Sequence, residues 1–161
     1  MINTILSALR KKTTDGQPSG ETVIYDREML VYNALRLLIP REQPGILGGK
    51  YSWLISPSTG HPLQLDLFFP RITTISEVEL ATPRCLAVEV QSSLHDGVWN
   101  DSKKRFFRSQ DDFERYVQNQ EWKRSQLLAR KIPFMEIDPT TEDLSPAILR
   151  RRLGSLFGLI L

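Results

Sequence analysis

The sequence is poor in the residues that build zinc sites and disulfide frameworks. Among its 161 residues it has one cysteine, Cys85, and two histidines, His61 and His95. A single cysteine cannot form an intrachain disulfide, and so few cysteines and histidines argue against a zinc site. Because such cysteine usage is typical of a reducing compartment, we expect a cytoplasmic, intracellular protein.

Long apolar runs are also absent. The C-terminal LFGLIL spans six residues, whereas about 20 apolar residues are needed to cross a bilayer. The opening MINTILSALRKK places apolar residues before basic ones and has no small-residue cleavage site, unlike a signal peptide. We therefore expect no membrane partner. The segment GILGGK lacks the GxxxxGK spacing of a phosphate-binding loop, so an NTPase is not expected.

No large excess of charge of one sign is present, because the formal net charge is +2 and the sequence pI is near 8.8. The basic residues are clustered instead, around positions 10–12, 103–108, 123–131 and 150–152. Such clusters are typical partners of a phosphate backbone, and the alternative is a set of solvated helix faces. The candidates for nucleic-acid contact are Lys103, Lys104, Arg105, Arg108 and, in the loop before them, Trp99.

Hydrophobic spacing and turn residues predict an alternation of helices and strands. An amphipathic helix over 2–12 is followed by a linker rich in Gly, Pro and Ser. A stronger helix over 21–39 comes next and ends before Pro40. The runs 51–56 and 62–69, joined by PSTGH, predict an antiparallel hairpin.

The second half of the chain predicts further strands and helices. In order, these are an irregular excursion over 70–84 with a short strand around 75–80, a buried strand at 85–91, a helical region at 102–131 broken once, a strand at 132–137 and a final helix at 146–158. We therefore expect an α/β fold in one domain, residues 1–161, with a mixed central sheet flanked by helices. Its αβββαβ core would cover about 21–137, with helices 2–12 and 146–158 as additions.

Few polar residues interrupt the apolar strands, which makes those few informative. Asp66 lies in LQLDLFF, and Glu89 and Gln91 lie in LAVEVQ, where the two-residue period places both on one face. Two carboxylates buried together need a positive charge between them, and Mg²⁺ prefers such oxygen ligands. The alternative is that each carboxylate faces solvent or pairs with an arginine such as Arg84. We expect a metal site with Asp66 and Glu89 as ligands.

Asp66 followed by Glu89-Val90-Gln91 resembles the signature of the PD-(D/E)XK nuclease superfamily, whose fold is restriction-endonuclease-like. The resemblance implies that Asp66 and Glu89 bind Mg²⁺, for which Mn²⁺ would substitute, and that Gln91 positions the attacking water. It also implies a further acidic residue from the helix before the hairpin. Glu28 is the first candidate and Glu21 the second, and the alternative for Glu28 is a salt bridge at the helix edge. The sequence departs from the signature because Leu65 replaces the proline and Gln91 replaces the lysine.

A fainter resemblance, to very-short-patch-repair endonucleases, covers QEWKRSQLLARKIPFMEI. It implies that a basic residue of the helix faces the metal site. Lys123, or else Lys103 or Lys104, would then supply the charge that Gln91 lacks. His95 could act as a general base, although a loop histidine without a catalytic role is the commoner case.

Together these observations predict a Mg²⁺-dependent endonuclease that hydrolyses DNA phosphodiester bonds. A homodimer or higher homo-oligomer would supply the two sites needed to cut both strands. The alternative is a catalytically decayed protein of the same fold that acts as a DNA-binding or assembly module, because Gln91 is neutral where the signature has lysine.

Overall fold

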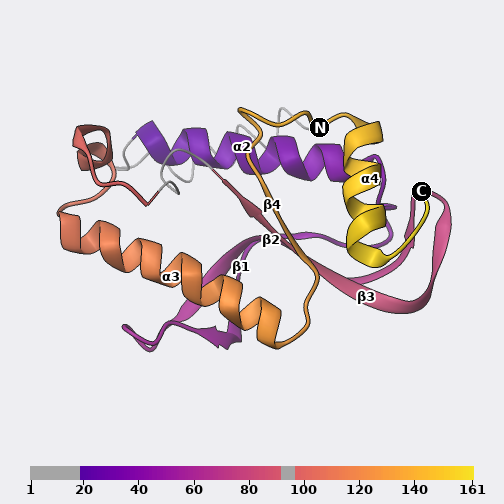
Figure 1. The fold of residues 1–161 in the computed structure, drawn as a ribbon, viewed down its shortest axis with the longest axis horizontal. Helices are drawn as coiled ribbons and strands as arrows, with labels where there is room; N and C mark the ends of the chain where they lie inside the picture. Colours follow the sequence, from indigo (N-terminus) through magenta and orange to yellow (C-terminus); the bar gives the residue numbers. More distant parts are fainter. Residues whose placement is uncertain (1–18, 92–96) are drawn as a thin grey trace.

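The computed structural model describes residues 19–91 and 97–161, with the side chains of the first helix from residue 26 onward. The elements in chain order (Figure 1) are α2 (Ser19–Arg36), β1 (Ile46–Ile55), β2 (Pro62–Ile75), β3 (Val78–Val90), the 3₁₀ helix η2 (Asp101–Arg105), α3 (Gln110–Ala129), β4 (Phe134–Ile137) and α4 (Pro146–Phe157). The predicted helix over 2–12 lies outside the described residues.

The four strands form one mixed sheet in the order β1-β2-β3-β4. The β1–β2 and β2–β3 pairs are antiparallel, and β3 pairs with β4 in parallel. A parallel pair requires a crossover connection, and the segment containing η2 and α3 supplies it. The predicted α/β class and the mixed sheet are therefore confirmed.

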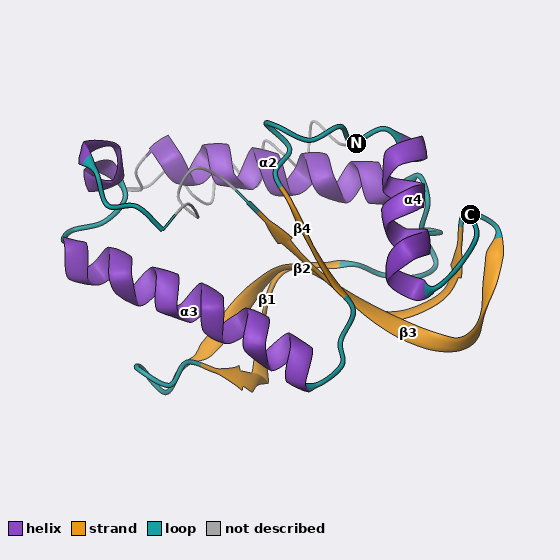
Figure 2. Ribbon diagram, viewed as in Figure 1, coloured by secondary structure: helices purple, strands orange, loops and turns teal. Residues whose placement is uncertain are grey.

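Helices cover both faces of this sheet (Figure 2). On one face, Val31 and Leu35 of α2 and Leu149 of α4 join the larger core with strand residues such as Val88. On the other face, a smaller core contains Leu127 of α3, with Leu54, Leu65, Phe68 and Ala87 from the strands. Because α2 and α3 pack in different cores, polar side chains from both helices reach the strands that lie between them.

β2 and β3 form a long hairpin that was not predicted, and this corrects the irregular excursion with a short strand around 75–80 that was expected over 70–84. Both strands continue through that stretch to a two-residue turn, in which Ser76 and Glu77 have φ of 48° and 68°. Pro70 and Pro83 lack the N–H that a ladder needs, and the register shifts between Phe69 and Ile72. The prolines therefore disturb the ladder without ending it.

Two further boundaries differ from the predictions, and one predicted break is confirmed. β1 begins at Ile46 and includes Gly48, which has a φ of 63°, so part of the expected Gly- and Pro-rich loop is strand. Helix α2 ends at Arg36, three residues before the expected end at 39. The break expected in the region 102–131 is confirmed, since η2 and α3 are separate and Ser109 caps α3 by accepting from the Asp112 N–H. Across residues 19–91 and 97–161, none of the helices combines the length and hydropathy that crossing a membrane requires.

The side chain of Gln43 fastens the hairpin to the end of α2. It is buried, its Oε1 accepts from the backbone N–H groups of Thr73 and Thr74, and its Nε2 donates to the Thr74 carbonyl at 2.9 Å. We expect Gln43→Ala to lower the free energy of unfolding by about 2 kcal/mol, because buried backbone groups lose their partners. Urea denaturation measures the change. Gln118→Ala, at an exposed position of α3, is the matched control, and equal losses in both variants would contradict this role.

Candidate metal centre

Asp66 and Glu89 meet where the β2–β3 ladder ends. The register pairs Leu67 with Val88, so the next residues along the two strands, Asp66 and Glu89, face one another. The Val90 N–H donates to Asp66 Oδ2 at 2.8 Å. In a regular ladder this N–H would donate to a backbone carbonyl of the neighbouring strand, and here the Asp66 side chain accepts in its place. The end of the ladder therefore places two carboxylates side by side in the middle of the sheet.

Glu28 adds a third acidic side chain from α2. It is only 5% exposed. Burial raises its pKa to about 9, with further increases from the charge of Asp66, a hydrogen bond with Asp66 and the charge of Glu89. At neutral pH the folded protein therefore holds Glu28 in its protonated form. The structure places Glu28 beside the other predicted ligands and in the interior, away from an exposed helix edge.

Lys123 of α3 is the cation beside this group. Its side chain is buried, and its Nζ donates to Glu89 Oε2 at 3.1 Å and to the Gln64 carbonyl at 3.0 Å. Burial raises the pKa of Glu89, Lys123 opposes that rise, and Asp66 adds to it. Glu89 Oε1 is buried and has no hydrogen-bond partner among the described residues. One oxygen of Glu89 is thus satisfied by Lys123 while the other is left for a further ligand.

Gln91 directly follows β3, two residues after Glu89, and is held by residues that sequence reasoning missed. Its Nε2 donates to Glu136 Oε2 of β4 at 2.9 Å. Arg124 of α3 donates to the same carboxylate from Nε at 2.5 Å and from Nη2 at 3.1 Å. Glu136 is the cross-strand partner of Glu89 in the parallel ladder. As the one charged residue in the apolar run IPFMEI, Glu136 carried the same signal in the sequence that singled out Glu89.

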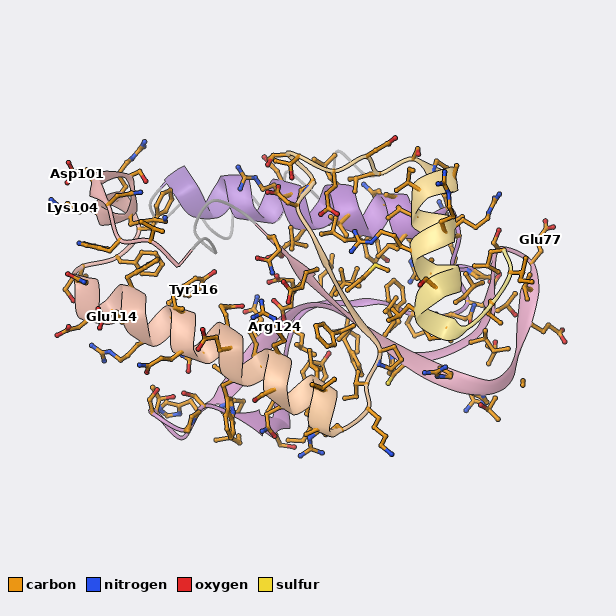
Figure 3. All side chains as sticks on the ribbon, in the orientation of Figure 1. Glu77, Asp101, Lys104, Glu114, Tyr116 and Arg124 are labelled. Atoms are coloured by element: carbon orange, nitrogen blue, oxygen red, sulfur yellow. The ribbon has the colours of Figure 1, made fainter. Side chains whose placement is uncertain are left out.

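Two cavities border these side chains. A cavity of about 190 Å³ is lined in part by Gln91, Tyr116 and Arg124, and Figure 3 shows the latter two side chains leaving α3 on the side that faces α2. Burial, together with the charges of Asp66 and Glu89, raises the pKa of Tyr116. A second cavity, of about 10 Å³, lies against Glu89, Gln91 and the two α3 residues Lys123 and Arg124. Both cavities therefore lie between the end of β3 and α3, and the smaller one reaches Glu89.

The residues expected to contact nucleic acid lie on and around η2. Lys104, Arg105 and Arg108 are exposed, and Lys104 also pairs with Asp101 at 2.7 Å. Lys103 is buried, with its Nζ donating to the Val98 carbonyl and lying over the Phe113 ring. The Trp99 ring also packs against Phe113, with the ring centroids 5.6 Å apart. Lys103 and Trp99 thus anchor the loop that presents the exposed basic residues.

The two histidines add no ligand to the described site. His61 is exposed in the connection between β1 and β2, and His95 lies outside the described residues. Within the described ranges, no group of three or more His, Cys, Asp and Glu side chains is arranged to hold a metal ion. Mg²⁺ needs one or two protein carboxylates and completes its shell with water. Asp66 and Glu89, with the unpartnered Oε1 of Glu89, fit that requirement.

Comparisons of the chain with protein families, with curated proteins and with solved structures found no match.

The raised pKa of Glu28 makes a prediction about stability. Between about pH 4.5 and 9 the folded protein binds a proton that the unfolded chain has lost, so stability should fall as the pH rises through this window. Glu28→Gln cannot ionise and should lessen that fall by an amount on the order of a few kcal/mol, while Glu89, whose pKa is also raised, keeps part of it. Denaturation at pH 5, 7 and 9 in the presence of a chelator measures it.

The control for this comparison is Glu79→Gln, at an exposed position of β3. It should keep the pH dependence of the wild type. Parallel stability curves for the wild type and Glu28→Gln would show that Glu28 does not carry a buried proton.

Proposed function

We propose that this protein is a Mg²⁺-dependent nuclease that hydrolyses DNA phosphodiester bonds. The observation that carries the proposal is the convergence of Glu28, Asp66 and Glu89 beside the buried cation Lys123. If all three carboxyl groups ionise, Lys123 balances only one of their charges. Buried charge of this kind is costly without a counter-ion, and one divalent cation would bring the group to neutrality.

The position of these residues in the fold also supports the proposal. The order α2-β1-β2-β3-α3-β4 agrees with the αβββαβ core that the sequence resemblance implies. Asp66 lies on β2, Glu89 lies near the end of β3 and Gln91 directly follows that strand, where the signature has its acidic residues and its lysine. Glu28 lies on the helix before the hairpin, where the resemblance expects the additional acidic residue.

Each side chain has a role that follows from its contacts. Asp66 and Glu89 would hold Mg²⁺, with Glu28 as a third acidic group. When bound, Mg²⁺ supplies charge that stabilises the developing phosphorane and lowers the pKa of the attacking water. Gln91 orients that water by hydrogen bonds, since an amide cannot take its proton. Lys123 brings from α3 the positive charge that position 91 lacks, within 3.1 Å of Glu89.

DNA is the proposed substrate because the connection between the two elements that carry Glu89 and Lys123 has exposed basic residues. Lys104, Arg105 and Arg108 are exposed on and after η2, in the segment that leads from β3 to α3. Contacts between such residues and phosphates release counter-ions, so affinity for DNA should fall steeply with salt.

The second candidate function is a nuclease-fold module that binds DNA without cutting it. The hydrogen bond between Gln91 and Glu136 favours it, because a neutral amide held by a carboxylate replaces the cationic lysine of the signature. The two candidates share DNA binding and differ in metal-dependent cleavage.

Cleavage of supercoiled, linear and branched DNA with Mg²⁺ or Mn²⁺ tests the proposal. Asp66→Asn, Glu89→Gln and Lys123→Met should each lower the rate by about 100-fold or more, because each removes charge at the centre. Asparagine at 66 can still accept from the Val90 N–H, so the fold should be kept. Lys50→Met, at an exposed position of β1, is the control and should cut like the wild type.

The outcomes separate the two candidates. Salt-dependent DNA binding without cleavage in either metal would favour the non-catalytic module. Cleavage that persists in Asp66→Asn and Glu89→Gln would place the active site elsewhere.

A further inference from the structure

The hydrogen bonds around Gln91 determine which way its amide points. Glu136 accepts two hydrogen bonds from Arg124 and one from Gln91. A carboxylate has no proton to donate, so the group that Gln91 turns toward Glu136 must be its NH₂. The carbonyl Oε1 is then the polar atom that Gln91 can offer to anything else in the site.

The ion pair of Arg124 and Glu136 is partly exposed, with side chains 49% and 31% accessible. Exposed pairs contribute little to folding because solvent screens them. A bidentate guanidinium nevertheless fixes the plane of a carboxylate, and Glu136 is held further by its place in β4 opposite Glu89. The pair is thus better suited to holding an orientation than to stabilising the fold.

A cavity of about 10 Å³ lies at the same place and is lined by Glu89, Gln91, Lys123 and Glu136, among others. That volume is about the minimum that holds one water molecule. The unpartnered Oε1 of Glu89 could accept from such a water. A single water beside both Glu89 and Gln91 is in the place that hydrolysis at the carboxylate centre requires.

We propose that Glu136 and Arg124 are positioning residues that hold Gln91 with its carbonyl oxygen toward this water. The orientation of the Gln91 amide follows from its hydrogen bonds alone. The effect of that orientation on DNA cleavage rests on the proposed nuclease function. Gln91 accepts a hydrogen bond from the water, which turns a lone pair of the water toward the phosphorus. As the oxygen of the water bonds to phosphorus, its proton leaves to bulk solvent, because an amide oxygen does not take it up. The P–O bond to the departing strand breaks, and solvent protonates the leaving oxygen.

Glu136→Gln tests this arrangement with a nearly isosteric change. Arg124 has donors only and makes its shorter bond, 2.5 Å from Nε, to Oε1. The carbonyl oxygen of the substituted side chain therefore takes the Oε1 position, and the new NH₂ takes the Oε2 position, which faces Gln91. Gln91 must then turn over and present NH₂ to the water. The NH₂ of Gln91 then faces the water in place of the carbonyl oxygen, while the fold and the carboxylate centre are unchanged.

In the cleavage assay we expect Glu136→Gln and Gln91→Ala each to lower kcat by about 10- to 100-fold, the range for partners that orient a metal ligand or its water. The double variant should be no slower than Gln91→Ala alone, because Glu136 acts through Gln91.

Melting temperatures should stay within about 2 °C of the wild type, because an exposed pair contributes little. Glu142→Gln breaks the comparable Arg152–Glu142 pair and should not change kcat. Independent, multiplicative effects, or a silent Glu136→Gln, would overturn the proposal.

A second measurement does not depend on cleavage. In an NMR spectrum of the full chain, the side-chain NH₂ of Gln91, identified by its loss in Gln91→Ala, should show one proton shifted downfield and slowed in exchange by Glu136. Glu136→Gln should remove both features, whereas Glu142→Gln should not. If the wild type never cuts DNA, the nuclease function fails while this spectrum still decides the orientation. An unperturbed Gln91 resonance in the wild type would overturn the orientation itself.

Discussion

The meeting of three acidic side chains at one point, two of them buried and Asp66 half-buried, is the constraint on which the rest of the structure depends. Glu28 and Glu89 are 5% and 6% exposed, and Asp66 lies between them. Three such groups cannot all be ionised in a dry site when the ammonium of Lys123 balances only one of them. Burial and mutual repulsion therefore raise the pKa of Glu28 and of Glu89, and the proton that Glu28 holds at neutral pH takes the place of a positive charge.

The fold supplies this arrangement from separate elements. The β2–β3 ladder ends at Leu67 and Val88, so Asp66 and Glu89 lie just beyond it, and the Asp66 side chain accepts from the Val90 N–H. Helix α2 brings Glu28 and helix α3 brings Lys123, and the two helices pack in different cores. Because β4 is parallel to β3, it sets a second glutamate, Glu136, next to Glu89. A site of this kind forms only when all of these elements are in place.

The centre could be predicted from the sequence to the extent that polar residues interrupt apolar strands. Asp66 and Glu89 can be identified in that way. Glu136 also interrupts an apolar strand, but it belongs to no motif that would mark it as functional. Its role depends on the parallel register of β3 and β4, which no spacing in the sequence reveals. The long hairpin was missed because Pro70 and Pro83 normally end strands. Here the register shifts around the first of them, and the strand continues.

The most direct test of the account is to titrate Mg²⁺ and Mn²⁺ into the full chain by calorimetry at pH 7, in buffers of different ionisation enthalpy. Because Glu28, with a pKa of about 9, holds a proton beside the proposed ligands, metal binding should release about one proton per site. Asp66→Asn should abolish the binding. An absence of binding heat and of thermal stabilisation at about 10 mM metal, or binding that Asp66→Asn leaves unchanged, would contradict a metal centre at this point.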